Sequence, residues 1–213
     1  MKPFRIKKIE RHLPRFPHIL DVGCGFHSPS VTKKYVGECV YHGLEKPGYV
    51  GIATGPNDSK DLSCIDRHLL VDLEAQPDES LALLPNQAYD SVIASNTLEH
   101  FTQTTSLHLL RSLPDKLKIG GVLFVEVPSH RVFKCFLPSN YDGLEHRVFL
   151  TLGDLVNSVL PTCEVLEAGT RRDWRNILRS PISLPLKLAM GMTYPTEYTD
   201  VLGLSYYLLA RKR

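Results

Sequence analysis

A short apolar run that ends in a glycine-rich turn is the feature that most constrains the fold of this chain. Residues 18–25 read His-Ile-Leu-Asp-Val-Gly-Cys-Gly, and a helix is predicted to begin near Ser28 or Ser30. Glycine is needed where the backbone turns tightly and a ligand approaches without a Cβ in the way. After the first strand of an open parallel sheet, such a turn lies in the ligand crevice. The G-x-G-x-x-G dinucleotide fingerprint would need glycine at position 28, so a pyrophosphate cradle is disfavoured.

Apolar runs alternate with helix-like stretches along the rest of the chain, which is typical of a parallel α/β sheet. Seven runs are predicted to be strands. They span residues 18–22, 40–44, 69–73, 89–94, 121–127, 163–167 and 204–210. The expected fold class is therefore α/β, with a seven-stranded, mostly parallel sheet and helices on both faces.

Two further helices are predicted from apolar residues at helical spacing. The first spans residues 104–119 and is expected to end at Gly120, although Pro114 inside it conflicts with regular helix geometry. The second spans residues 151–160, with Thr151 as a candidate N-cap.

The length and composition indicate one globular domain covering residues 1–213. Single cores run to about 250 residues before they split, and 43% hydrophobic with 23% charged residues is the globular average. The basic start has no apolar stretch after it, so no signal peptide is predicted. Two long connections, about residues 129–147 and 170–200, are predicted to be substrate-facing insertions.

The cysteines indicate a reducing compartment. Five are present, an odd number, and none has C-x-x-C spacing. Neither a disulfide framework nor a metal site is therefore predicted. Free thiols in a chain without a signal peptide favour a cytoplasmic location.

Acidic residues follow the next two predicted strands. Glu45 lies 20 residues after Gly25, where a carboxylate can accept two hydrogen bonds from a ribose diol. Asp72 could accept a hydrogen bond from an adenine amine. Together with Asp21, these acids would repel the phosphates of a dinucleotide and tolerate a cationic sulfonium. The alternatives are a solvated loop acid for Glu45 and a helix cap for Asp72.

These motifs together resemble those of class I S-adenosylmethionine-dependent methyltransferases. Residues 19–25 resemble the first motif of that family, and residues 89–101 resemble the fourth-strand motif of the subgroup that ends in Leu-Glu-His. Residues 117–123 resemble the glycine-ended helix that enters strand five. The resemblance covers residues 17–170, with the last strand at 204–210. It implies a Rossmann-like sheet whose last strand is antiparallel.

The resemblance implies S-adenosyl-L-methionine as the cofactor and methyl transfer by in-line displacement as the reaction. The expected acceptor is a small molecule or glycan, attacking through a hydroxyl. Glu45 replaces the commoner aspartate, which keeps the carboxylate but changes its reach. The residues predicted to bind the cofactor are Asp21, Gly23, Cys24, Gly25, Glu45, Asp72, Leu73, Ser95 and Asn96.

Histidines and arginines supply the remaining candidates. His100 and His146 are candidate catalytic bases, because the pKa of histidine lies nearest neutrality. The alternative for His100 is a residue that orients the loop after strand four. Arg147, Arg171 and Arg172 are candidates for contacting an anionic substrate.

A narrower resemblance concerns the biological setting. Residues 25–30, 145–151 and 171–175 resemble segments of small bacterial methyltransferases associated with cell-surface polysaccharide synthesis. This implies a lipid-linked saccharide as acceptor. Residues 177–192 mix apolar and basic side chains and could contact a membrane surface; a lid or a dimer contact is the alternative.

Two other functions stay open. A nucleic-acid methyltransferase could grip phosphates with the basic residues 1–15. Residues 95–98 read Ser-Asn-Thr-Leu, however, and not the Asn-Pro-Pro-Tyr signature of base-amine methylases, so a nucleic-acid partner is not expected. The second alternative is a non-catalytic, cofactor-binding interaction subunit.

Overall fold

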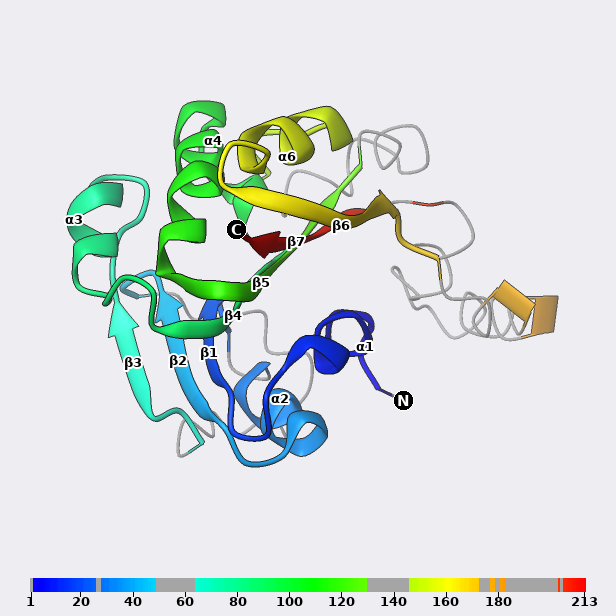
Figure 1. Cartoon of the computed structure of the whole chain (residues 1–213). Coiled ribbons are helices and arrows are strands. Elements are labelled where there is room, and N and C mark those ends of the chain that lie inside the picture. The colour runs from blue at the N-terminus through cyan, green and yellow to red at the C-terminus, as the bar shows by residue number, and fades with distance from the viewer. Residues whose placement is uncertain are drawn as a thin grey trace.

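The computed structural model describes residues 2–25, 28–48, 64–129, 146–172, 177–178, 181–182, 203 and 205–213. A seven-stranded sheet of order β3-β2-β1-β4-β5-β7-β6 runs through its centre (Figure 1). β7 is antiparallel to β5 and to β6, and the other strand pairs are parallel. The strands are β1 (His18–Val22), β2 (Val40–Glu45), β3 (Arg67–Leu70), β4 (Tyr89–Ser95), β5 (Leu117–Pro128), β6 (Cys163–Thr170) and β7 (Ser205–Lys212).

Helices cover both faces of the sheet, which confirms the predicted fold class. Alternate residues of each strand point to opposite faces: Ile19 of β1 packs with α1 and α2, whereas its neighbour Leu20 joins the core under the other helices. One face carries α1 (Phe4–Ile9) and α2 (Ser28–Val36), and the other carries α3 (Pro77–Ala82), α4 (Gln103–Ser112) and α6 (Leu152–Val159).

The prediction that one helix spans residues 104–119 is wrong at its carboxyl end. α4 ends at Ser112, because Pro114 lacks an N–H and its ring would clash with the preceding helical turn. A short 3-10 helix, η3 (Leu113–Lys116), follows, and β5 begins at once. Gly120, with φ +82°, therefore does not end the helix. It lies in an irregularity of β5, between the pairs Tyr89–Leu117 and Ser91–Val122.

The third strand is also shifted from its predicted position at residues 69–73. β3 ends at Leu70, and the Val71 N–H donates to the Glu45 carbonyl oxygen at 2.8 Å. Asp72 then turns the chain, because its side chain accepts hydrogen bonds from the backbone two and three residues ahead. This local bond competes with strand pairing.

The basic amino terminus forms a docked helix. Ile6 and Ile9 of α1 are fully buried against the sheet. The Lys8 ammonium contacts the Glu167 carboxylate and the Tyr207 hydroxyl, and the Phe4 ring meets the Tyr207 ring edge-on at 5.0 Å. The basic stretch at residues 1–15 is therefore partly built into the fold.

The two predicted insertions, residues 129–147 and 170–200, lie largely outside the described residues. Leu178 and Ile182, which are 78% and 82% exposed, belong to the described part of the second one. Contact of this segment with a membrane surface remains a prediction. Within the described ranges, no helix has the length and apolar character needed to cross a membrane.

Candidate functional site

The glycine turn after β1 is fixed by contacts with β2 and with the segment after β4. The N–H groups of Gly23 and Cys24 both donate to the Leu44 carbonyl oxygen, at 2.9 and 3.2 Å. Gly23 has φ +69°, and a Cβ there would lie 2.3 Å from Thr97 Oγ1. Thr97 Oγ1 in turn donates to the Val22 carbonyl oxygen at 2.9 Å. Gly23 is thus required both by its backbone angle and by the close approach of Thr97.

Gly25 meets the acid at the end of β2 directly. Its N–H donates to Glu45 Oε2 at 2.8 Å, and the Lys46 N–H donates to Glu45 Oε1 at 3.0 Å. Gly25 has φ +56°, and among the described residues no heavy atom lies within 4 Å of where a Cβ would be. The two residues predicted to share one ligand therefore lie together, at a position that the other described residues leave open.

Asp21 lies beneath this turn rather than on its surface. It is 2% exposed, and its Oδ2 accepts hydrogen bonds from the hydroxyls of Ser28 and Tyr41, the latter at 2.6 Å. Arg5 of α1 donates to Ser28 Oγ at 2.9 Å. Asp21 thus connects β1, β2 and the two helices on this face. Sequence reasoning missed Arg5 and Tyr41, because each resembles an ordinary residue of its own element.

Cys24 is a buried thiol. Its Sγ lies 2.7 Å from the position that a Cβ on Gly43 would take, so the side chain fills the space above β2. Burial raises its pKa, and the nearby charges of Asp21 and Glu45 raise it further. The thiol therefore stays protonated at neutral pH, and the backbone of Cys24 is the part suited to line a ligand site.

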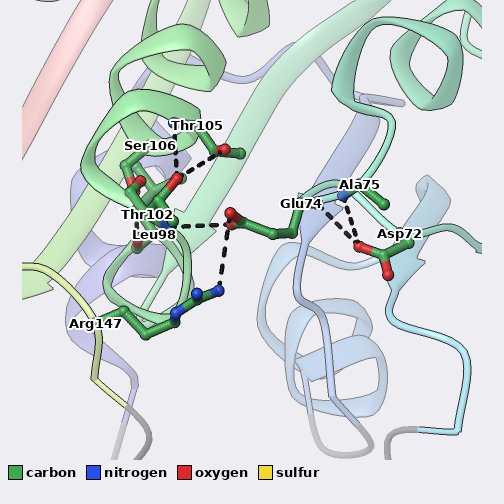
Figure 2. A network of polar contacts seen from close by, with 8 residues as sticks. All are labelled: Asp72, Glu74, Ala75, Leu98, Thr102, Thr105, Ser106 and Arg147. Carbon is green, nitrogen blue, oxygen red and sulfur yellow. Dashed lines mark hydrogen bonds and ion pairs between the residues drawn. The ribbon is translucent and has the colours of Figure 1, made fainter.

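The turn after β3 is held by a polar network (Figure 2). Asp72 Oδ1 accepts from the N–H groups of Glu74 and Ala75, each at 3.0 Å. The Glu74 carboxylate accepts from the Thr102 N–H at 3.0 Å and pairs with Arg147 Nη1 at 3.7 Å. The predicted adenine ligand thus uses one oxygen to cap its own turn. The predicted substrate ligand Arg147 is engaged with Glu74.

Three more predicted cofactor residues lie near these turns. Ser95 ends β4, and Asn96 is exposed with φ +53°, a conformation that asparagine tolerates better than most residues. The Asn96 N–H donates to the Glu126 carbonyl oxygen at 2.9 Å. Leu73 is buried in the core, so only its backbone is available to a ligand.

The other two arginines predicted to bind substrate differ in their surroundings. Arg171 Nη1 bonds Glu126 Oε1 at 2.9 Å, and its guanidinium lies 5.4 Å from the centre of the Phe4 ring. Since Glu126 is buried, this pair is internal to the fold. Arg172 is exposed.

The two predicted bases, His100 and His146, lie together with a buried acid that sequence reasoning missed. Their ring centres are 5.0 Å apart, and His146 Nε2 lies 4.0 Å from Glu99 Oε1. Burial and the proximity of His100 lower the pKa of His146 to about 4. Burial, with the charge of Glu126, raises the pKa of Glu99 to about 8. At neutral pH the His146 imidazole is therefore neutral, a form in which one ring nitrogen can accept a hydrogen bond or bind a cation.

The signal for Glu99 was its place in Leu98-Glu-His100, which forms the 3-10 helix η2 after β4. Helical geometry over this short turn points Leu98 and Glu99 inward and leaves His100 exposed. His146 lies 46 residues after His100 in the sequence. The spacing of these residues therefore could not predict that Glu99, His100 and His146 lie together.

Comparison with known proteins identifies the fold. No protein-family model matches the chain, and no curated protein sequence matches it. An S-adenosylmethionine-dependent methyltransferase from Archaeoglobus fulgidus superposes with a TM-score of 0.57 at 18% identity, over 98% of this chain and 91% of that chain. One from Mesorhizobium loti gives 0.57 at 16% identity, over 97% and 96%.

A third solved structure was determined with a bound cofactor. Phosphoethanolamine N-methyltransferase 2 of Haemonchus contortus, in complex with S-adenosyl-L-methionine, gives a TM-score of 0.60 at 13% identity, over 97% of this chain and 51% of that chain. This chain therefore has the fold of class I S-adenosylmethionine-dependent methyltransferases.

Proposed function

We propose that this protein is an S-adenosylmethionine-dependent methyltransferase that acts on a small-molecule or glycan acceptor, through a hydroxyl. The observation that carries this proposal is the hydrogen bond from the Gly25 N–H to Glu45, at a glycine whose Cβ position has no heavy atom of the described residues within 4 Å. A carboxylate and a glycine without a side chain share one edge of the sheet there. The likeness of the fold to cofactor-dependent methyltransferases supports it.

The residues present fit this cofactor. Each carboxylate oxygen can accept two hydrogen bonds, so Glu45 can keep its bond to Gly25 while accepting from a ribose diol. Asp72 Oδ1 is used by its turn, so we assign Oδ2 to the adenine side. Ser95 and Asn96, which adjoin the glycine turn through Thr97, would border the methionine end.

The bound cofactor would supply a methyl group on a cationic sulfonium. An acceptor oxygen would bond to the methyl carbon as the carbon–sulfur bond breaks, and the electron pair would leave with the sulfur. The acceptor proton must also be lost. The protein contributes mainly by alignment, which is worth several kcal/mol of the barrier. We propose that the His100 and His146 pair assists the loss of the proton.

The acceptor proposal is tested by transfer of labelled methyl from S-adenosylmethionine to fractions of a cell extract. Lipid and saccharide fractions should be labelled by the wild-type protein. Glu45→Gln keeps the size of the side chain but replaces an acceptor-only carboxylate with an amide. Because hydrogen bonds to a charged group contribute about 1.5–3 kcal/mol, we expect labelling at limiting cofactor to fall by about 10–100-fold.

Glu164→Gln is the matched control, because Glu164 is an exposed acid on β6, away from the glycine turn. It should label as the wild type does. Equal labelling by both variants would remove Glu45 from the cofactor site. Label that appears only in nucleic acid would reject a small-molecule or glycan acceptor.

A further inference from the structure

Two histidines and a buried carboxylate converge at the end of β4. In the described part of the chain, one ligand atom from each of Glu99, His100 and His146 lies within 4.8 Å of the other two. Two imidazoles and one carboxylate form the donor set of many catalytic zinc sites and of non-haem iron sites. We propose that these three side chains form a binding site for a divalent transition-metal cation of the Zn²⁺ type.

The buried carboxylate is the independent observation that points to a ligand. Glu99 is 2% exposed, and among the described residues neither of its side-chain oxygens has a hydrogen-bond partner. A buried carboxyl group without a partner is costly whether it is ionised or protonated, and buried carboxylates in proteins are paired, hydrogen-bonded or coordinate metals. His146 Nε2 lies 4.0 Å from Glu99 Oε1, which is too far for a hydrogen bond. A cation bound beside His146 would give the Glu99 carboxylate a partner.

The distances suit a cation after small side-chain movements. Zinc takes histidine nitrogen and carboxylate oxygen at about 2.0–2.2 Å, so tetrahedral ligands lie roughly 3.4 Å apart. The three atoms would have to approach one another by roughly 1.4 Å at most. His100 is exposed and can make such a movement without disturbing the core.

The backbone holds the three ligands in place. The Glu99 carbonyl oxygen accepts from the N–H groups of Arg147 and Val148, at 2.8 and 3.3 Å. These bonds fix the segment that carries His146 against η2. The same short helix is tied to α4, because Ser106 Oγ donates to the Leu98 carbonyl oxygen at 2.7 Å (Figure 2). The sequence predicted no metal site because it contains no regular ligand spacing.

A cation here has a chemical use, and this step rests on the proposed function. Three protein ligands leave at least one coordination position open. The site follows β4 at the same edge of the sheet as the glycine turn. An acceptor hydroxyl bound to the cation would have a lower pKa, so its proton would pass to solvent and its oxygen would attack the methyl carbon. The histidines would then hold the cation instead of acting as bases.

The test is metal binding by the untagged full-length chain, in the absence of cofactor. Protein stripped with a chelator is titrated with Zn²⁺ in a calorimeter, and the bound metal is counted after dialysis. We expect one Zn²⁺ per chain. Loss of outer partners of a metal site already costs about 10–100-fold in affinity, so Glu99→Gln and His100→Ala should each cost at least that.

His108→Ala is the matched control. His108 lies on α4, is exposed and pairs with Asp78 at 2.8 Å, so it is a histidine–carboxylate pair to which the described residues add no third ligand. Its replacement should leave Zn²⁺ affinity unchanged. Thermal melting checks that each variant is folded. If Glu99→Gln does not fold, His100→Ala decides alone, because its side chain is exposed.

The proposal is overturned if the wild type binds no Zn²⁺, or if His100→Ala binds it as tightly as the wild type. Its failure is distinguishable from failure of the proposed function. Zn²⁺ binding without any binding of S-adenosylhomocysteine would support the proposed metal site and reject the proposed methyltransferase function. Binding of S-adenosylhomocysteine without binding of Zn²⁺ would support the methyltransferase and reject the metal site. The histidines would then be the candidates for accepting the proton.

Discussion

At the scale of single residues, two glycines of one turn are needed for different reasons. Gly23 and Gly25 both have positive φ, at +69° and +56°. At Gly23 a Cβ would collide with Thr97, whose hydroxyl is held by the Val22 carbonyl. At Gly25 a Cβ would meet no heavy atom of the described residues within 4 Å. The first glycine serves the fold, and the second leaves room for a ligand.

Alanine substitutions should separate these two roles. Positive φ costs alanine about 1–2 kcal/mol, and the collision with Thr97 adds the cost of overpacking, about 1–3 kcal/mol. We expect Gly23→Ala to lower the free energy of unfolding by about 2–4 kcal/mol and Gly25→Ala by about 1 kcal/mol. Gly25→Ala should also weaken binding of S-adenosylhomocysteine.

Gly37→Ala is the control for backbone strain, because Gly37 has φ +89° with no atom within 4 Å of a Cβ. Urea denaturation and calorimetry on the three variants give the comparison. If Gly23→Ala and Gly37→Ala lowered the free energy of unfolding equally, the close approach of Thr97 to Gly23 would not contribute to the loss of stability. If Gly25→Ala bound ligand like the wild type, the open space would not be the ligand site.

At the scale of elements, the sequence predicted the parts whose signals are local. β1 lies where the apolar run placed it, and α6 begins after Thr151, which forms the predicted N-cap within a capping box. The prediction failed where the bounds of an element depend on a partner far along the chain. β5 begins at Leu117 because β4 pairs with it there, and this competes with the helical spacing of the leucines before it.

The same limit applies to the candidate site. Glu45 and Gly25 lie together because the ends of adjacent parallel strands meet, and their binding of a cofactor stays a prediction. Glu99 was missed, because its relation to His146 depends on backbone hydrogen bonds between distant segments. The anchoring of α1 was missed for a similar reason, since Lys8 finds its carboxylate in β6.

That anchor should make the attachment of α1 depend on pH. Burial alone would raise the pKa of Glu167, but hydrogen bonds from Lys8 and Tyr207 outweigh it, and the pKa lies below its usual 4.5. A lowered pKa in the folded state stabilises the fold above pH 4.5, and this contribution is lost as the pH falls below that value. Glu167→Gln should destabilise the protein by about 1 kcal/mol at pH 7.

The variant should also flatten the dependence of stability on pH below 4.5, measured by urea denaturation at several pH values. Glu164→Gln, on the exposed side of the same strand, should retain the wild-type slope. An unchanged slope in Glu167→Gln would show that the contact with Lys8 does not couple the helix to the sheet.

At the scale of the whole molecule, basic and acidic side chains lie in different places and have different roles. The net charge is only +2, yet Arg5, Lys8 and Arg171 contact groups inside the fold. This leaves fewer basic residues of the amino terminus to grip phosphates than the sequence suggests. The carboxyl edge of the sheet carries Glu45 and Asp72, as a cationic ligand would favour.

The central claim is that the edge formed by Gly25 and Glu45 binds S-adenosylmethionine. Isothermal titration of the cofactor-free, full-length chain with S-adenosylhomocysteine tests it most directly. We predict one molecule bound per chain with a Kd on the order of micromolar, weakened about 10–100-fold by Glu45→Gln and unchanged by Glu164→Gln. The account would be contradicted by an absence of binding at millimolar ligand, or by equal affinity of the two variants.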